Sequence, residues 1–186
     1  MDIIKNKTGR NMFKITASIF IIVLLTLTGC NKNASNEKPV TPEAITRGES
    51  MAPDFSLENA NGGNIKLSEY KGKVVIVDFW ATWCPPCRKG IPDLIDIKKQ
   101  YGDQIVIIGI SVDTDSKGDV VPFIQKMGIN YPIAYATPEV TQAYGGIEAI
   151  PTSFVVDKAG KIVDSHVGLV PKENFTTVID KLLGKS

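Results

Sequence analysis

The sequence predicts an α/β domain with a central mixed β-sheet and helices on both faces of the sheet. Residues 74–79 and 105–112 form two nearly continuous apolar runs, which are typical of strands buried on both faces. A helical pattern lies between them, so the three segments predict a β–α–β unit with parallel strands and a right-handed crossover. Apolar residues recur at helical spacing over residues 175–183, which supplies an amphipathic helix for one sheet face.

The elements up to the second buried strand follow from local patterns. Residues 55–57 and 65–67 alternate apolar and polar side chains around the Asn- and Gly-rich residues 61–64, so they predict an N-terminal β-hairpin. The helix of the β–α–β unit is expected over residues 86–101. Its inner side is expected to carry Ile91, Leu94, Ile95 and Ile97.

The elements after the second buried strand alternate in type. We expect a helix over residues 120–127 that ends at Gly128, a short strand over residues 131–134 and a short helix over residues 139–144. Two strands joined by a hairpin turn are expected at residues 152–156 and 161–167. The amphipathic helix at residues 175–183 closes the domain.

Composition excludes several classes of protein. The chain has 186 residues, of which 43% are hydrophobic, as is ordinary for a packed soluble domain. The 21 basic and 20 acidic residues give a formal net charge of +1, which is not the excess of positive charge that is typical of proteins that bind nucleic acids. Three cysteines are too few for a small protein that depends on several disulfides. With one histidine in addition, the chain also offers few ligands for a metal site.

The first thirty residues have the order of a secretion signal. A basic start is followed by an apolar run over residues 15–27, which is shorter than the about 20 residues that a spanning helix needs. The run ends in Leu27-Thr28-Gly29-Cys30, which resembles the lipobox of bacterial lipoproteins. That resemblance implies cleavage before Cys30 and two acyl chains on its thiol, enough for stable anchoring. The alternative is an uncleaved anchor in which Cys30 is incidental.

Three regions follow from this interpretation. We expect residues 1–29 to be a lipoprotein signal peptide. Residues 30–50 are expected to be the lipidated cysteine and a flexible tether, because they are polar and contain few large apolar side chains. Residues 51–186 are expected to form the folded domain.

The chemistry is carried by Trp83-Cys84-Pro85-Pro86-Cys87, which follows the first buried strand and opens the predicted helix. Cysteines three residues apart can close a small disulfide ring there, and prolines fit a first helical turn. Unpaired backbone N–H groups and the positive end of the helix dipole favour a thiolate on Cys84. We therefore expect Cys84 to attack and the more buried Cys87 to resolve. The alternatives are a zinc half-site and a purely structural disulfide.

With its flanking segments, the motif resembles the thioredoxin-fold thiol–disulfide oxidoreductases, in particular their membrane-tethered TlpA/ResA-like (redoxin) branch. The resemblance covers about residues 52–183 and implies a thioredoxin-like fold in which residues 113–135 are an inserted helix and strand. Its motifs are Ala52-Pro53-Asp54-Phe55, Gly72-Lys73-Val74-Val75, residues 77–87 and Ile150-Pro151-Thr152.

The resemblance implies roles for individual residues. Cys84 and Cys87 become the redox pair, and Pro151 becomes a cis-proline whose loop, with Ile150, faces the two sulfurs. Trp83, Pro85 and Pro86 become supports of the active site.

Asp78 matches the buried aspartate of thioredoxins. A carboxyl on a buried strand should have a raised pKa and can relay a proton to or from Cys87. The alternative is a satisfied core acid without a catalytic part.

Two positions depart from the family pattern. Gly90 stands where many cytochrome-maturation members carry a glutamate, and Gly109 stands where thioredoxins carry the lysine that pairs with the aspartate. Both departures argue against a specific cytochrome role and leave the general chemistry intact. Asp113 and Asp115 are expected in a solvated loop, although a cation site is the alternative, and His166 is expected at the surface.

The expected function is that of a lipid-anchored, extracytoplasmic oxidoreductase that reduces protein disulfides. It needs no organic cofactor, metal or nucleic acid. Its partners are protein disulfides or dithiols, apocytochrome c among them, and a membrane thiol reductant.

One alternative is a thiol peroxidase of the peroxiredoxin type, since Pro53-Asp54-Phe55 also begins many peroxiredoxins, although Asp78 stands where their proline would be. Another is a non-enzymatic binding lipoprotein.

Overall fold

The structure, a computed structural model, describes residues 50–185. The predicted signal peptide, Cys30 and nearly all of the tether lie outside the described residues, so those interpretations stay predictions. Within residues 50–185, no helix is both long enough and apolar enough to cross a membrane.

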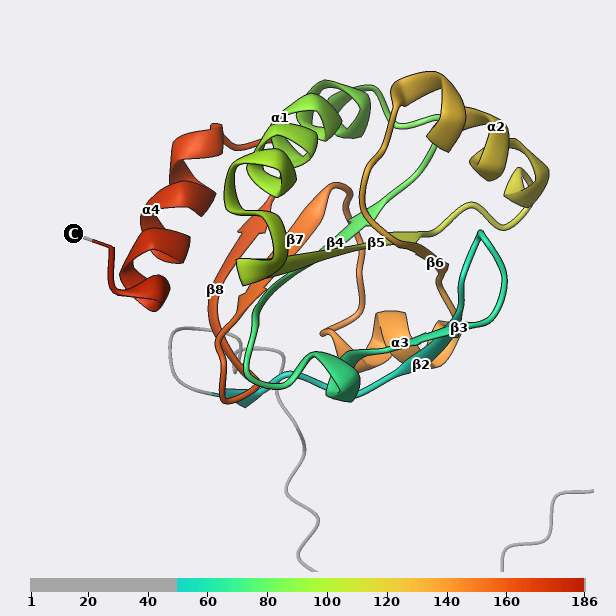
Figure 1. Ribbon diagram of the computed structural model, residues 1–186. Helices are drawn as coiled ribbons and strands as arrows, with labels where there is room; N and C mark the ends of the chain where they lie inside the picture. The colour runs from blue at the N-terminus through green and yellow to red at the C-terminus, as the bar shows by residue number, and fades with distance from the viewer. Residues whose placement is uncertain (1–49, 186) are drawn as a thin grey trace, which may run out of the picture. The chain divides into compact units, whose positions relative to one another are not determined.

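A six-stranded mixed sheet forms the centre of the domain (Figure 1). Its strands are, in spatial order, β1 (Ser50–Met51), β8 (Lys161–Val167), β7 (Thr152–Val156), β4 (Val74–Trp80), β5 (Ile105–Ser111) and β6 (Ile133–Tyr135). β4, β5 and β6 are parallel neighbours, whereas β7 and β8 each run antiparallel to the neighbour towards β4. β2 (Ser56–Glu58) and β3 (Asn64–Lys66) form a separate antiparallel hairpin.

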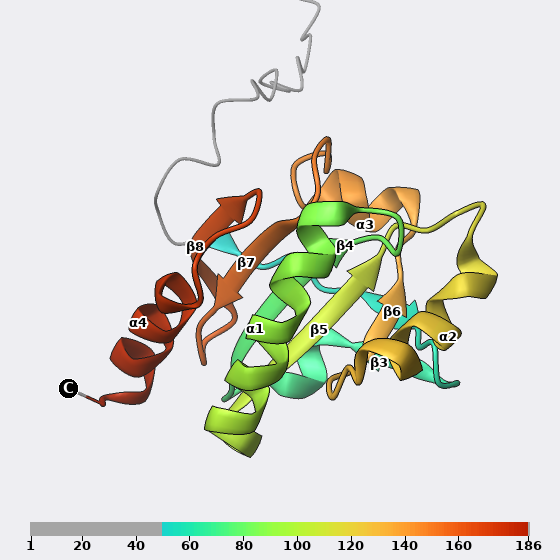
Figure 2. The ribbon, with the colours of Figure 1, turned by 90° about the horizontal axis from the view of Figure 1, so that it is seen from above.

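Helices cover both faces of the sheet, which confirms the predicted fold class. α1 (Pro85–Tyr101), α2 (Lys117–Met127) and α4 (Lys172–Leu183) lie on one face, and Figure 2 shows α1 and α4 side by side across it. α3 (Pro138–Ala143) and the β2–β3 hairpin lie against the other face. Short 3-10 helices, Leu67–Tyr70 and Gly102–Gln104, follow β3 and α1.

The central strand β4 supplies both cores. All seven of its residues are buried, and because side chains alternate along a strand they divide between the two sheet faces. Ile76 and Trp80 enter the core under α1, α2 and α4. Val77 and Phe79 enter the opposite core, where the rings of Phe79 and Tyr144 lie with centroids 5.4 Å apart. Asp78 therefore lies on the face of the sheet that α1 covers.

Some sequence predictions need correction. β1 was missed because two residues carry no periodic pattern; it pairs Met51 with Lys161 at the sheet edge. The predicted surface position of His166 is wrong, because α4 covers that side of β8. Its ring packs edge-on against Phe175 with centroids 5.4 Å apart, and its side chain is 15% exposed.

The absence of a lysine at position 109 has a packing reason. A Cβ on Gly109 would lie 2.5 Å from Ile133 Cδ1 and 2.9 Å from Trp80 Nε1. The indole of Trp80, itself 1% exposed, and Ile133 therefore fill the space in which thioredoxins place a side chain. No cation stands beside Asp78 at this position.

We predict that Gly109→Ala lowers the free energy of unfolding by about 1–3 kcal/mol, because a methyl group would overpack the core between Trp80 and Ile133. The matched control is Gly118→Ala in α2, where an added Cβ meets nothing within 4 Å. That change should be neutral or stabilising by up to about 1 kcal/mol. Urea unfolding of both variants is the measurement, and equal midpoints would contradict the packing account.

Candidate active site

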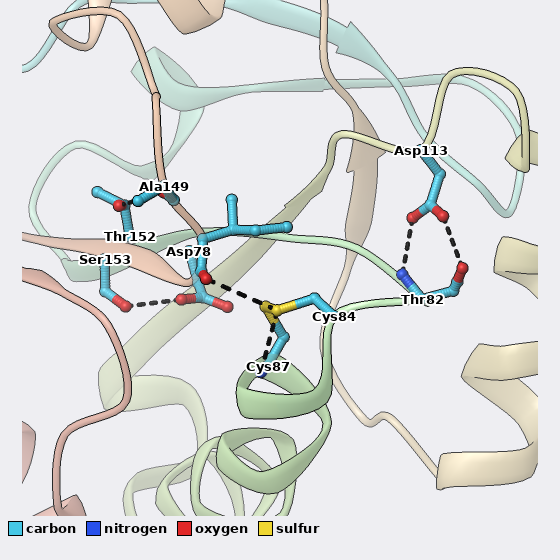
Figure 3. The surroundings of a disulfide bond; sticks show 9 residues. Asp78, Thr82, Cys84, Cys87, Asp113, Ala149, Thr152 and Ser153 are labelled. Carbon is cyan, nitrogen blue, oxygen red and sulfur yellow. Dashed lines mark hydrogen bonds between the residues drawn. A yellow bond between two sulfur atoms is a disulfide. The ribbon is translucent and has the colours of Figure 1, made fainter.

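The disulfide Cys84–Cys87 lies where β4 ends and α1 begins, and the two Cα atoms are 5.3 Å apart (Figure 3). Cys84 is the N-cap residue of α1, and its sulfur accepts a hydrogen bond of 3.2 Å from the backbone N–H of Cys87. Pro85 and Pro86 occupy the first turn of α1, where backbone N–H groups have no partner within the helix, so the N–H that proline lacks is not needed there. The sulfur thus takes the place of a capping oxygen, and the same contact favours a thiolate there.

The expected difference in burial between the two cysteines is wrong for this disulfide form. Cys84 and Cys87 are each 3% exposed. Cys84 is covered because the loop before β7 reaches over it, and its Sγ lies 3.7 Å from the carbonyl oxygen of Ile150. Trp83 next to it is 61% exposed, so its indole offers apolar surface at the site.

The loop that faces the sulfurs contains the cis bond Ile150–Pro151, in agreement with the resemblance. Two hydrogen bonds hold this loop. The N–H of Gly168 donates to the Pro151 carbonyl oxygen at 2.7 Å, and Thr152 Oγ1 donates to the Ala149 carbonyl oxygen at 2.8 Å. The Ile150 carbonyl is thereby held beside Cys84.

Asp78 lies behind the disulfide and is 4% exposed. Ser153, directly opposite it on β7, donates a hydrogen bond of 2.6 Å from its hydroxyl to Asp78 Oδ1. Burial raises the pKa of Asp78 to about 7, although the Ser153 hydrogen bond lowers it in part. The carboxyl is therefore able to exchange a proton near neutral pH.

Asp78 and Cys87 line the same small cavity, which also touches Ser153, Gly90 and Leu169. Its volume of about 20 Å³ is room for one water molecule. A Cβ on Gly90 would lie 3.0 Å from Leu169 Cδ1, so any side chain at this position would require Leu169 to shift. Sequence reasoning missed Ser153 and Leu169, because neither belongs to a motif and both come from distant parts of the chain, Ser153 from β7 and Leu169 from the loop after β8.

The prediction that Asp113 lies in a solvated loop is wrong, whereas Asp115 is exposed as expected. Asp113 is 4% exposed and accepts hydrogen bonds from Thr82 and two serines. These hydrogen bonds lower the pKa of Asp113 against the opposing effect of its burial. As for a metal, residues 50–185 contain no cluster of three or more His, Cys, Asp or Glu side chains that could hold one.

Comparison with known proteins connects this geometry to named relatives. The sequence pattern of the AhpC/TSA family matches residues 49–165. The chain is 31% identical over 169 residues to the "Thioredoxin-like protein YneN" of Bacillus subtilis, covering 90% of this chain and 97% of that protein. It is 39% identical over 128 residues to the "Thiol-disulfide oxidoreductase ResA" of the same organism, covering 68% and 70%.

Solved structures show the same architecture. A putative thiol:disulfide interchange protein DsbE from Chlorobium tepidum superimposes with a TM-score of 0.68 at 32% identity, covering 75% of this chain and all 100% of that one. The pneumococcal exposed lipoprotein thioredoxin Etrx1 from Streptococcus pneumoniae gives a TM-score of 0.62 at 29% identity, covering 70% and 100%.

We predict that replacing Asp78 changes how stability depends on pH. In the unfolded chain the carboxyl loses its proton near its ordinary pKa of 3.8, whereas in the folded protein it holds the proton to about pH 7. The free energy of unfolding should therefore fall as pH rises from about 4 to 7 and then level off. Asp78→Asn removes this loss, so the free energy of unfolding of the variant minus that of the wild type should rise by roughly 4 kcal/mol across that window.

Urea unfolding of the oxidised protein at several pH values is the measurement. Ser153→Ala, which removes the hydrogen bond that lowers the pKa of Asp78, should extend the decline to higher pH. Parallel stability curves for the wild type and Asp78→Asn would show that the carboxyl is not held protonated.

Proposed function

The chain belongs to the AhpC/TSA family and is a thioredoxin-fold thiol–disulfide oxidoreductase, and we propose that it reduces protein disulfides outside the cytoplasm while a lipid on Cys30 holds it at the membrane. The observation that carries the redox part is the Cys84–Cys87 disulfide at the start of α1, which faces the Ile150–Pro151 loop. In this arrangement the Ile150–Pro151 loop covers Cys84 Sγ, and Cys87 lines a small cavity together with Asp78.

The reaction is two successive thiol–disulfide exchanges. In the reduced protein, the thiolate of Cys84 attacks one sulfur of a substrate disulfide. A Cys84–substrate S–S bond forms, the substrate S–S bond breaks, and the second substrate sulfur leaves as a thiolate that takes up a proton. The thiolate of Cys87 then attacks Cys84 Sγ, closes the Cys84–Cys87 disulfide and releases the first substrate sulfur. Two electrons pass from the cysteine pair to the substrate.

The division of roles follows from the surroundings of the two sulfurs. Cys84 Sγ receives the Cys87 N–H at the positive end of α1, which stabilises negative charge on the attacking sulfur. Cys87 must lose a proton before it can attack. Asp78 has a pKa of about 7 and lines the same cavity as Cys87, and this cavity has room for one water molecule. Asp78 is therefore expected to accept that proton through water.

The substrate is expected to approach as an extended segment beside the Ile150–Pro151 loop. The carbonyl oxygen of Ile150 lies at Cys84, where it can accept a hydrogen bond from the substrate backbone. The exposed indole of Trp83 offers apolar contact to side chains next to the disulfide. Both contacts are largely independent of sequence, which fits a reductase of many protein disulfides. Apocytochrome c is one candidate among them.

The membrane location rests on the N-terminal sequence. The basic start, the short apolar run and the Leu27-Thr28-Gly29-Cys30 end support lipidation of Cys30, and a polar tether would let the domain reach its partners. The similarity to a pneumococcal exposed lipoprotein thioredoxin supports the same interpretation. A membrane thiol reductant would restore the Cys84–Cys87 dithiol after each turnover.

We predict that Cys87→Ser accumulates a mixed disulfide with its substrate, because Cys84 still attacks and no second thiol resolves the product. Insulin with intact disulfides is the probe, and non-reducing electrophoresis followed by mass spectrometry at Cys84 is the measurement. Cys84→Ser is the matched control and should form no adduct and reduce no insulin. Undiminished insulin reduction by Cys84→Ser would exclude the proposed mechanism, and rapid consumption of hydrogen peroxide by the wild type would favour the peroxidase alternative.

We predict that the mature protein begins at Cys30 and carries the mass of a diacylglyceryl group, and that Cys30→Ala releases it from the membrane fraction. Mass spectrometry of the N-terminal peptide and membrane fractionation are the measurements. An intact segment from Met1 to Gly29 on the mature protein would contradict lipid anchoring and leave the redox chemistry untouched.

A further inference from the structure

Asp113 has no part in the mechanism above, although it lies beside the redox motif and is buried. It accepts two hydrogen bonds from Thr82, one from the backbone N–H at 2.9 Å and one from the hydroxyl at 2.6 Å (Figure 3). Ser111 Oγ donates to the same carboxylate at 2.8 Å, and Ser116 Oγ donates at 2.5 Å. Each carboxylate oxygen thus accepts two hydrogen bonds, which holds the group ionised and in one orientation.

The residue that Asp113 holds is the first central residue of the active-site turn. The N–H of Cys84 donates to the carbonyl oxygen of Ala81 at 3.2 Å, so residues 81–84 form a four-residue turn with Thr82 and Trp83 at its centre. The turn directs Trp83 to solvent and delivers Cys84 to the N-cap of α1. Because Thr82 is bound through both its backbone and its side chain, its orientation depends on Asp113.

Three elements meet at this carboxylate. Ser111 is the last residue of β5, Thr82 follows β4, and Ser116 is the N-cap residue of α2. The N–H of Val112 also donates to the carbonyl oxygen of Trp80 at 2.9 Å, which joins the two strand ends. The redox turn is therefore anchored to parts of the fold that lie outside the Cys84–Cys87 ring and the Ile150–Pro151 loop.

We propose that Asp113 is a positioning residue that sets the redox equilibrium of the Cys84–Cys87 pair by holding the turn that carries Cys84. The inference rests on the proposed redox roles of the two cysteines. A fixed turn keeps Cys84 Sγ within bonding distance of Cys87 and so raises the effective concentration of one thiol at the other. A released turn lets Cys84 sample more positions, which disfavours the disulfide and favours the dithiol.

The charge of Asp113 acts in the same direction. A fixed carboxylate beside the turn disfavours a thiolate on Cys84, and its removal favours the reduced, thiolate-bearing form. Both effects predict that loss of Asp113 makes the couple more oxidising. A purely structural role would destabilise the two redox states equally and leave the equilibrium between them unchanged.

The test is equilibration of the full chain, purified in detergent, with reduced and oxidised glutathione. In this reaction the Cys84–Cys87 bond is reduced to two thiols while two glutathione thiols are oxidised to one disulfide. We expect Asp113→Asn to shift the equilibrium at least about tenfold towards the dithiol, or about 30 mV. Asp115→Asn removes the same charge from an exposed position of the same loop and should stay within about twofold of the wild type.

If Asp113→Asn does not fold, the same equilibration is measured with Thr82→Val. This substitution removes the hydroxyl donor and keeps the shape of the side chain, so it should shift the equilibrium in the same direction by a smaller factor. The double variant should shift it no further than Asp113→Asn alone, because the two residues act through one contact.

The outcomes separate this inference from the proposed function. Absence of any reversible couple in the wild type would overturn both. A normal couple in the wild type, together with equal equilibria for Asp113→Asn and Asp115→Asn, would overturn the positioning role alone. An unchanged equilibrium with a lowered unfolding free energy would likewise reduce Asp113 to a structural contact.

Discussion

The redox site depends on one hydrogen bond, from the backbone N–H of Cys87 to the sulfur of Cys84. The first N–H groups of a helix have no partner within the helix, so some acceptor must satisfy them. Here the acceptor is the reactive sulfur, which makes the capping of α1 and the stabilisation of a thiolate the same interaction. The buried strand β4 fixes where that cap lies, because its own residues are locked in both cores. The Asp113 contacts then hold the turn that leads from β4 to this cap, and the Ile150–Pro151 loop covers the sulfur.

Asp78 shows what a buried functional group costs this fold. Desolvation on β4 raises its pKa, and Ser153 is the hydrogen-bond donor that partly offsets the effect. The position is kept free of a neighbouring cation because Trp80 and Ile133 fill the space next to Gly109. Burial and one hydroxyl therefore set the pKa of this carboxyl, and no charged side chain of residues 50–185 pairs with it. Leu169, packed on Gly90, narrows the cavity that connects this carboxyl to Cys87.

Patterns that repeat along the chain were predictable from the sequence, and contacts between distant segments were not. Continuous apolar runs predicted β4 and β5, and the Cys84–Cys87 spacing predicted the redox ring. The cis bond at Pro151 came only through a family resemblance, since it has no local signal. The burial of Asp78 followed from the apolar run over residues 74–79, whereas its match to a catalytic aspartate came from the resemblance. Asp113 was misjudged because a loop aspartate has the same sequence pattern whether it faces water or a buried threonine. The exposure of Cys84 was misjudged because Ile150, whose carbonyl covers it, lies 66 residues further along the chain.

The reduction potential of the Cys84–Cys87 couple tests the account most directly. Redox titration of the wild-type protein in thiol–disulfide buffers, followed by the fluorescence of the exposed Trp83, would measure it. The account predicts a reversible two-electron couple near the reducing end of the thioredoxin-fold range, about −270 mV. A potential near about −120 mV would mean that the protein inserts disulfides, and the absence of a reversible couple would contradict the oxidoreductase mechanism altogether.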